Sequence, residues 1–510
     1  MGKTADVSLR PEHPPRTPLS ELVAWLSSSG ERVQLVGDPA VVVTGLSLSS
    51  QRVQPGDLYA ALPGARAHGI GFVGEALSAG AVAVLTDSVG AAKAGSDATV
   101  VIVDRPRDLL GRLAAWLYGE PATSLRMIGV TGTQGKTTTV RLAEAALQAA
   151  GVRAASIGTL GTRVDGRDVP TTLTTPEAPD LHGLFAMMRE TEVRACAMEV
   201  SSHALVMGRV DGVVFDVAVF LNLGRDHLDF HSDEEDYYRA KASLFTPERA
   251  RLALADVDDE HGRRLAEETR LPVRTLSLRD PAADWRAEDV VAEAVGSRFT
   301  AVGPGGVRVP SAVHLPGGFN VSNALAAVAA CVEAGFDADA VAAGLARTTG
   351  VPGRLEQIDE GQDFLVLVDY AHKPDAVAAA LRTLRPLTEG RLIVVLGAGG
   401  DRDHGKRPIM AGIAADLADL LIVTDDNPRT ENPAEIRAQM LAGTRAAEGE
   451  VLEIGDRRAA ISEAVRRAAT GDIVLVAGKG HETGQEIAGT VHPFDDRDVA
   501  RDALRESGAR

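Results

Sequence analysis

The segment GVTGTQGKTTTVRL, residues 129–142, constrains the fold more than any other part of the chain. An apolar approach leads into two glycines around a polar loop, and Lys-Thr-Thr then opens an amphipathic stretch. Glycines let the backbone N–H groups face one anion, lysine adds charge for the β/γ-phosphates, and a hydroxyl can bind Mg²⁺. The segment therefore predicts a phosphate-binding loop in which Gly132, Gly135, Lys136 and Thr137 have these roles. The alternative is a glycine-rich turn with a surface lysine.

The residues around this loop predict a parallel α/β sheet. RMIGV reads as a strand, and TTTVRLAEAALQAAG reads as a helix that Gly151 stops. The runs ACAMEV and FDVAVFLNL have the length and flanks of strands buried on both faces of a parallel sheet. We therefore expect a central domain, residues 125–348, with a doubly wound, mostly parallel P-loop sheet.

Two further α/β domains are expected, because a chain of 510 residues is too long for one hydrophobic core. Residues 1–124 form a smaller N-terminal α/β domain, with strands such as AVAVLTD and ATVVIVD. Residues 349–510 form a C-terminal Rossmann-like α/β domain with four strands, FLVLVDYAH, LIVVLGAGG, DLLIVTDDNP and DIVLVAGKGH. Each of these strands runs into a polar or glycine-rich loop, which predicts one ligand crevice at their carboxyl ends.

Charge and hydropathy restrict the partners. A net charge of -18 argues against nucleic acid and anionic membrane surfaces, since there is no basic stripe to release counterions. The longest apolar runs fall short of the ~20 residues that span a bilayer, and the first residues lack a secretory core. We therefore expect a cytoplasmic protein with no membrane partner, in which Cys196 and Cys331 are free, buried thiols.

The strand ACAMEV has Glu199 near its end and is followed by Ser201 and Ser202. A carboxylate that leaves a buried strand beside a phosphate loop is a candidate metal ligand. The alternative is a helix N-cap, for which either serine is suited. Both interpretations are compatible with the pattern.

The next strand ends in NLGRDHLDFH, which gathers Asn222, Asp226, His227 and Asp229. His227 follows a second buried strand beside the first, so we expect it to be a metal ligand rather than a structural histidine. Lys241 follows in a helical, mostly apolar context. From the residues alone it reads as a lysine that extends its ammonium from a helix into solvent.

A kinase, a GTPase or a ligase could all use such a loop. The guanine-reading pattern Asn-Lys-x-Asp is absent from the sequence, which argues against a GTPase switch. Together, the motifs resemble those of the Mur ligase family, the ATP-dependent enzymes that build the peptide stem of peptidoglycan precursors. The motifs that carry the resemblance occur in family order between about Gly45 and Asp498: TGTQGKTTT, LTTPE, AMEVSSHAL, NLGRDHLDFH, YYRAK, LPGGFNVSNALAA, VPGRLE, VDYAHKPDA, GAGGDRDHGKRP, DDNPR and GKGHE.

The resemblance implies an ATP site, a metal site and a modified lysine. The implied ATP contacts are Gly132, Thr133, Gln134, Gly135, Lys136, Thr137, Thr138, Asn320, Asn323 and Arg354. The implied Mg²⁺ ligands are Thr137, Glu199, His227 and Lys241. Lys241 matches a family lysine that CO₂ converts to a carbamate, which replaces the solvent-exposed interpretation. The implied catalytic residues are Lys136, Glu199, His227 and Lys241.

The resemblance also implies two substrate sites. The UDP-sugar peptide would contact Ser50, Thr174, Thr175, Ser201 and Arg209. An amino-acid pocket that selects diaminopimelate over lysine would contain Arg402, Asp426, Asn427, Pro428, Arg429, Gly478 and Glu482. The selection has a physical basis, since diaminopimelate carries an extra carboxylate that an arginine fork can bind bidentately.

The implied activity is an ATP-dependent amide ligation in the cytoplasmic stage of peptidoglycan biosynthesis, by a monomer. It would add 2,6-diaminopimelate to UDP-N-acetylmuramoyl-L-alanyl-D-glutamate through an acyl phosphate, and thereby serve cell wall biogenesis and cell division. One alternative is a related ligase that adds lysine or glutamate, including the folylpolyglutamate type. The other is a nucleotide-dependent regulatory protein that no longer ligates.

Overall fold

The computed structural model describes residues 10–64, 67–95, 98–171, 173–224, 226–227, 230–293, 295–445 and 449–508. The chain divides into two compact units, which are described separately. The first comprises Met1–Arg286 and Ala326–Gly344, and the second comprises Ala287–Leu325 and Leu345–Arg510. The domain boundaries expected after residues 124 and 348 stay predictions.

The N-terminal part of the first unit contains a five-stranded sheet of order β2-β7-β6-β5-β4. Its pairs are parallel except β2–β7. Leucines of α1 and α4 pack on one face of the sheet, and Ala76 of α2 packs on the other. The elements are β1 (Thr17–Pro18), β2 (Val33–Val36), β3 (Val42–Val43), β4 (Gly45–Ser47), β5 (Asp57–Ala60), β6 (Ala83–Thr86), β7 (Val100–Val103), α1 (Leu19–Ser28), α2 (Val73–Ser78), α3 (Ser88–Ala91) and α4 (Pro106–Leu117).

Within this unit the larger sheet has the order β11-β10-β9-β12-β8-β13-β14-β15, and the first residues of β16 (Trp285–Glu293) pair parallel with β15. From β9 to β15 every neighbouring pair is parallel, and β10 and β11 add an antiparallel edge. Its elements are β8 (Arg126–Thr131), β9 (Ala154–Gly158), β10 (Gly161–Val164), β11 (Arg167–Val169), β12 (Ala195–Glu199), β13 (Val217–Phe220), β14 (Ala253–Asp256), β15 (Val273–Ser277), α5 (Lys136–Ala149), α6 (Ala178–Glu190), α7 (Ser202–Val206), α8 (Glu234–Ala242), α9 (Glu260–Glu268) and α11 (Ala338–Leu345).

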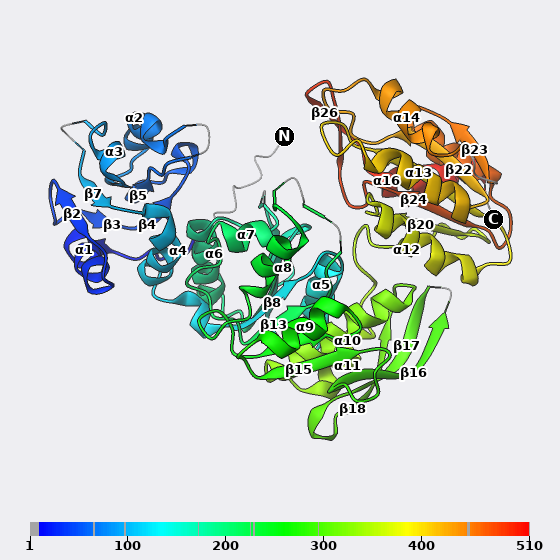
Figure 1. Ribbon diagram of the computed structural model, residues 1–510, viewed down its shortest axis with the longest axis horizontal. Coiled ribbons are helices and arrows are strands. Elements are labelled where there is room, and N and C mark those ends of the chain that lie inside the picture. The colour runs from blue at the N-terminus through cyan, green and yellow to red at the C-terminus, as the bar shows by residue number, and fades with distance from the viewer. Residues whose placement is uncertain are drawn as a thin grey trace. The chain divides into compact units, whose positions relative to one another are not determined.

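Helices cover both faces of these parallel strands. Alternate strand residues such as Met127 and Met198 pack with residues of α6, α7, α8 and α9 in one cluster. The helix that follows β8, α5, packs against β9 and β12 (Figure 1). Burial on two faces explains why β8, β12 and β13 are continuous apolar runs, and the expected doubly wound sheet is confirmed.

A third group of elements comprises β16 (Trp285–Glu293), β17 (Gly296–Val302), β18 (Arg308–Val313) and α10 (Gly318–Glu333). The strands β17 and β18 pair antiparallel. Helix α10 begins within the motif LPGGFNVSNALAA and is rich in alanine.

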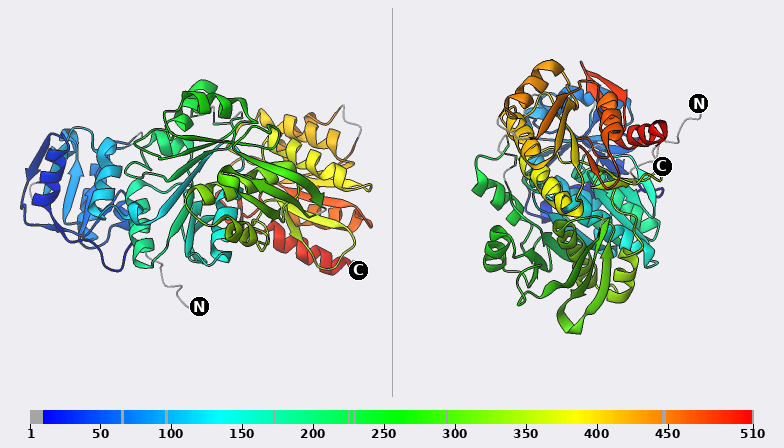
Figure 2. Two further views of the ribbon diagram at one scale, coloured as in Figure 1. Left: turned by 90° about the horizontal axis from the view of Figure 1, so that it is seen from below. Right: turned by 90° about the vertical axis from the view of Figure 1, so that its right-hand side faces the viewer.

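The C-terminal sheet has the order β19-β20-β24-β21-β22-β23 and is parallel except for β19. Helices α12, α13 and α14 cover one face, and α15 and α16 cover the other (Figure 2). The elements are β19 (Glu356–Ile358), β20 (Leu365–Asp369), β21 (Leu392–Ala398), β22 (Leu420–Asp425), β23 (Glu450–Glu453), β24 (Ile473–Ala477), β25 (Gly484–Ile487), β26 (Thr490–Pro493), α12 (Pro374–Leu384), α13 (Lys406–Leu417), α14 (Pro433–Ala442), α15 (Arg457–Arg467) and α16 (Asp496–Ser507).

Several smaller expectations are confirmed. Cys196 and Cys331 are free and buried. Gly151 follows the end of α5 with a φ of 83°, a left-handed conformation that suits a helix stop. Within the described ranges, the chain has no helix with the length and apolar character required to span a bilayer.

Candidate functional site

The predicted phosphate loop joins the end of β8 to the start of α5. Gly132 and Gly135 have φ values of 154° and 87°, which favour glycine over residues that carry a Cβ. The Lys136 Nζ turns back over the loop and donates to the carbonyls of Gly132 at 2.7 Å and Thr133 at 3.1 Å. Thr137 and Thr138 are buried in the first turn of α5. The helix N-terminus and the lysine thus meet at one loop, the arrangement that attracts phosphate.

Asn222, which follows β13, holds the loop from the side. Its Oδ1 accepts from the backbone N–H groups of Thr133 at 3.1 Å and Gln134 at 2.9 Å. Its Nδ2 donates to the Gln134 carbonyl at 3.2 Å. The motif NLGRDHLDFH contained this residue, but the loop-holding role was not predicted because nothing local connects it to position 133.

Glu199, the last residue of β12, is buried and contacts the first turn of α5. The Thr137 Oγ1 donates to Glu199 Oε1 at 2.9 Å. Thr159 was not predicted, yet its backbone N–H donates to the same oxygen at 2.7 Å and its hydroxyl to Oε2 at 3.3 Å. A side chain at Gly158 would collide with the Glu199 carboxylate. The carboxylate is therefore held in one orientation, directed at the phosphate loop.

The expected sugar-peptide residues lie beside Glu199. Thr174 and Thr159 pair through their hydroxyls at 3.3 Å. The Thr175 hydroxyl donates to the Glu199 carbonyl at 2.9 Å and lies 3.4 Å from the Ser201 Oγ. Ser201 also caps α7, so the N-cap alternative holds for that residue without excluding a ligand.

Arg209 also contacts this group of residues. Its Nη1 donates to the Thr175 carbonyl at 3.3 Å, and its Nε lies 2.8 Å from Glu177 Oε1. The structure therefore brings Thr174, Thr175 and Arg209 together at the Glu199 end of the sheet. Glu177, which ends the LTTPE motif, was not predicted as a member of the group.

Lys241 of α8 is only 1% exposed, so its ammonium does not extend into solvent. The Nζ donates to the Gly132 carbonyl at 2.9 Å and lies 4.5 Å from the ring centre of Tyr237. A lysine carbamate retains one N–H at this nitrogen, so that hydrogen bond is compatible with the expected modification. Lys241 is therefore buried against the phosphate loop.

His227 lies in the same region, with a φ of 54°. Its ring packs edge-on against that of His203, with the two ring centres 4.9 Å apart. Its Nε2 lies 3.2 Å from Asp226 Oδ2. Asp229 lies outside the described residues.

The described residues contain no cluster of three or more His, Cys, Asp or Glu that could hold a metal ion. Mg²⁺ is commonly held by one or two protein oxygens together with nucleotide phosphates and water, so a protein cage of that kind is not required. Thr137 and Glu199 place a hydroxyl and a carboxylate together at the loop. This hydroxyl and this carboxylate are suitable oxygen ligands for Mg²⁺.

The remaining predicted nucleotide and sugar residues lie elsewhere in the two units. Ser50 precedes β5 and donates to Glu75 Oε2 at 2.8 Å. In the second unit Asn320 and Asn323 are buried at the start of α10, where the Asn323 Nδ2 donates to Asn320 Oδ1 at 3.2 Å. The Arg354 guanidinium lies 4.6 Å from the ring centre of Tyr370.

Two buried groups at the end of β20 and just after it have shifted pKa values. Burial raises the pKa of the Asp369 carboxyl, although the backbone N–H groups of Leu355 and Ala371 each donate to it at 2.7 Å. Burial and nearby lysines lower the pKa of His372 to about 4. His372 is therefore neutral at pH 7.

The residues predicted for the amino-acid pocket lie where the loops after β22 and β24 meet. The Asn427 Nδ2 donates to Glu482 Oε2 at 2.8 Å. Gly478 has a φ of 119°, and a Cβ there would lie 2.5 Å from Asp426 Oδ2. The Arg429 Nη1 donates to the Gly400 carbonyl at 2.7 Å. The predicted residues thus form two contacting pairs, Asn427 with Glu482 and Asp426 with Gly478.

The loop after β21 packs against the loop after β22. A Cβ at Gly399 would lie 2.9 Å from Arg429 Nη1 and 3.9 Å from the Arg402 Cγ, so both arginines border one glycine. A side chain at Gly400 would collide with the Pro428 carbonyl, which packs the two loops closely. Arg402 is exposed.

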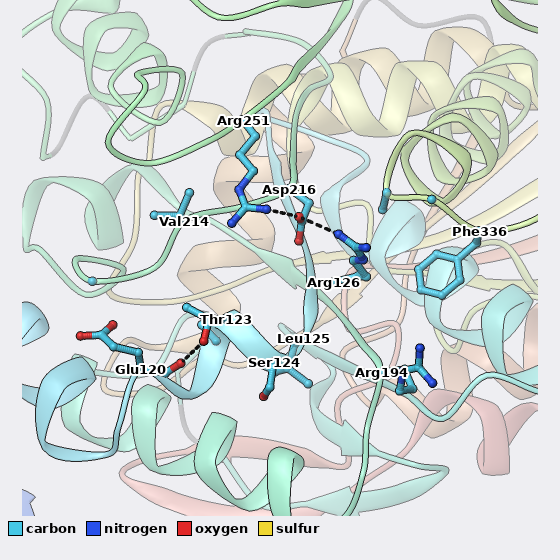
Figure 3. A pocket seen from close by; sticks show the side chains of 14 residues that line it. Glu120, Thr123, Ser124, Leu125, Arg126, Arg194, Val214, Asp216, Arg251 and Phe336 are labelled. Atoms are coloured by element: carbon cyan, nitrogen blue, oxygen red, sulfur yellow. Dashed lines mark hydrogen bonds and ion pairs between the residues drawn. The ribbon is translucent and has the colours of Figure 1, made fainter. Parts of the chain in front are cut away.

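A cavity of about 550 Å³ lies at the opposite end of the parallel strands, away from the phosphate loop. Arg126, its first lining residue on β8, and Arg251 both approach Asp216 Oδ1, at 3.4 Å and 3.1 Å (Figure 3). Arg194, which precedes β12, lines another wall. Since the phosphate loop follows the last residue of β8, this cavity is separate from the candidate site.

The fold and the loop define the class: a P-loop α/β protein with a second, Rossmann-like sheet. The comparisons agree along the whole chain. The Mur ligase family catalytic domain matches residues 42–118, the Mur ligase middle domain matches residues 130–331, and the Mur ligase glutamate ligase domain matches residues 353–480.

Two curated relatives are named UDP-N-acetylmuramoyl-L-alanyl-D-glutamate--2,6-diaminopimelate ligase. That of Streptomyces avermitilis is 53% identical over 98% of each chain, and that of Streptomyces coelicolor is 51% identical over 98% of each. A solved structure of a protein with the same name is 33% identical, with a TM-score of 0.68 over 97% of this chain and 99% of the other. The chain belongs to the Mur ligase family.

Proposed function

We propose that the chain adds 2,6-diaminopimelate to UDP-N-acetylmuramoyl-L-alanyl-D-glutamate, with ATP converted to ADP and phosphate. The observation that carries this proposal is the 53% identity, over 98% of both chains, to a relative named for that reaction. The amino-acid pocket supports the choice of substrate, since it combines two arginines with the carboxylates of Asp426 and Glu482.

The proposed reaction has two steps. The terminal glutamyl carboxylate attacks the γ-phosphorus of ATP, which forms an acyl phosphate and releases ADP. The amine of diaminopimelate then attacks the activated carbonyl, and the tetrahedral intermediate expels phosphate to leave an amide. Catalysis of this kind depends mainly on positioning and charge neutralisation.

The residues of the first unit would hold the reacting phosphate and carboxylate. Lys136 and the N-terminus of α5, on a loop that Asn222 holds in place, would bind the β/γ-phosphates. Bound Mg²⁺ would supply neutralising charge at these phosphates. Thr137, Glu199, His227 and a carbamate on Lys241 would be its ligands. Thr175, Ser201 and Arg209 would orient the peptide end of the sugar nucleotide beside Glu199.

The second unit would bind the incoming amino acid. An arginine binds a carboxylate with two parallel hydrogen bonds, and Glu482 supplies the opposite charge for an ammonium. Diaminopimelate carries both groups at its far end, whereas lysine carries only the ammonium. In the structure the Arg429 Nε lies 3.4 Å from Glu486 Oε2, and the far carboxylate of diaminopimelate would give this guanidinium a second anionic partner that lysine lacks.

We also propose that this reaction takes place in the cytoplasm, where ATP and UDP-linked sugars occur, and that the protein acts as a monomer. The test is phosphate release by the purified chain with ATP, Mg²⁺ and the UDP-linked dipeptide, with diaminopimelate, lysine, glutamate or no amino acid. We expect phosphate release and a product of the corresponding mass only when diaminopimelate is the amino acid supplied. Equal turnover with lysine or glutamate would overturn the substrate assignment, and no release with any amino acid would overturn the ligase assignment.

A further inference from the structure

Lys479 is a buried cation in the loop after β24 that the predicted site does not include. Its side chain is 0% exposed. The Nζ lies 3.0 Å from Asn427 Oδ1, 3.0 Å from Glu482 Oε2 and 2.6 Å from the Gly484 carbonyl. A lysine ammonium has three N–H donors, so every donor has a partner. A fully buried lysine is uncommon because removing the ammonium from water is unfavourable, and among the described residues this one pairs with a single carboxylate, that of Glu482.

The contacts of Lys479 determine how Asn427 and Glu482 are oriented. The Asn427 Oδ1 accepts from Lys479 and from the Glu486 N–H at 3.0 Å. The amide nitrogen Nδ2 therefore turns the other way and donates to Glu482 Oε2. A flipped amide would place an NH₂ group against the ammonium, so the lysine selects one orientation. Glu482 is in turn held through Oε2, and within the described residues its Oε1 accepts no hydrogen bond.

These contacts join two loops that are distant in the sequence and in the sheet. Asn427 follows β22 and Lys479 follows β24, and β21 lies between these strands. The ammonium thus connects the loops across the carboxyl end of β21. It also places a positive charge 3.0 Å from Glu482 Oε2, which offsets part of the negative charge that Glu482 and Asp426 bring to these loops.

We infer that Lys479 is a positioning residue for the amino-acid pocket: it orients Asn427 and leaves Glu482 Oε1 directed at the ammonium of the incoming amino acid. This inference rests on the proposed function. It predicts that loss of the Lys479 charge weakens the use of diaminopimelate far more than the use of ATP.

The test measures steady-state kinetics of the full chain with Lys479→Met, which keeps the length of the side chain and removes its charge. We expect the KM for diaminopimelate to rise by about tenfold or more, the range for loss of hydrogen bonds to a charged group, while the KM for ATP changes less than about twofold. KM does not depend on the amount of folded enzyme. The change in KM for diaminopimelate can therefore be compared with that for ATP even when a variant folds poorly. Lys479→Gln keeps a hydrogen-bond donor without a charge, so its KM for diaminopimelate should fall between those of the wild type and Lys479→Met. Lys93→Met on an exposed lysine is the matched control.

A double-mutant cycle separates positioning from general stability. If Lys479 acts through Glu482, the KM of the Lys479→Met/Glu482→Gln pair should exceed that of the worse single variant by less than about twofold. Additive effects, or equal increases for ATP and diaminopimelate, would overturn the inference. A wild-type chain without diaminopimelate-dependent phosphate release would instead refute the proposed function, so the two failures are distinct.

Discussion

The hydroxyl of Thr137 donates to Glu199 Oε1 at 2.9 Å, although 62 positions separate the two residues in the chain. Thr137 lies in the first turn of α5 and Glu199 ends β12, so the contact joins the helix that follows the phosphate loop to a strand beside it. It provides the hydroxyl and carboxylate pair on which the proposed magnesium site depends. The first prediction follows from this pair.

Glu199→Gln should raise the Mg²⁺ concentration needed for half-maximal turnover by about tenfold, because the amide keeps the shape of the side chain but loses the negative charge. The measurement is phosphate release against Mg²⁺ at saturating ATP. Thr137 and Thr159 can still donate to the amide oxygen, so the unfolding midpoint should stay close to that of the wild type. An unchanged Mg²⁺ requirement would remove Glu199 from the proposed ligands.

Lys241→Ala should lower turnover by at least about a hundredfold, the usual scale for loss of a positioned charged group at a reacting centre. Acetate should restore part of the activity if the working group is a carbamate, because the added carboxylate replaces its oxygens. Ethylammonium should restore it instead if the working group is the ammonium that contacts Gly132. The comparison of the two rescues, measured as phosphate release, therefore determines which form acts, and restoration by ethylammonium alone would contradict the carbamate.

Arg429→Ala should raise the KM for diaminopimelate by about 10- to 100-fold, because a charge-assisted contact to its far carboxylate would be lost. The KM for ATP should change little. Arg458→Ala is a suitable control, since Arg458 is exposed in the same sheet domain and pairs with Asp502 at 3.3 Å. Comparable increases for both substrates would refute the proposed selectivity of the arginine.

His182 should contribute to acid sensitivity outside the site. Its Nε2 contacts the Asp211 carbonyl at 3.0 Å, while its Nδ1 is buried without a hydrogen-bond partner among the described residues. Burial lowers its pKa from 6.5 to about 4. The unfolded chain therefore binds more protons than the folded chain between these values, and stability falls as the pH drops through this window.

His182→Gln should remove this contribution, which reaches about 3 kcal/mol between pH 6.5 and pH 4 at 1.36 kcal/mol for each pKa unit. The measurement is the free energy of unfolding by urea at several pH values, with His492→Gln on an exposed strand as the control. Parallel pH profiles for the variant and the wild type would contradict the prediction.

The elements near the site were predictable from local patterns. The apolar run before Gly132 became β8, the amphipathic stretch after it became α5, and the buried runs that contain Cys196 and Val217 became β12 and β13. These predictions succeed because strand and helix periodicity depends on residues within a few positions of each other. The resemblance to a family added candidates such as Lys241 that the residues alone had assigned to the surface.

The sequence by itself determined the phosphate loop, the buried strands and the polar residues that follow each of them. Only the tertiary structure decided which of those residues meet, since it placed β12 between β9 and β8, and β24 between β20 and β21. An apolar run buried on two faces has the same pattern wherever it lies in a parallel sheet, so strand order cannot be read from it. For this reason Thr159, Asn222 and Lys479, each joined to its partner across the sheet, emerged only in the folded chain.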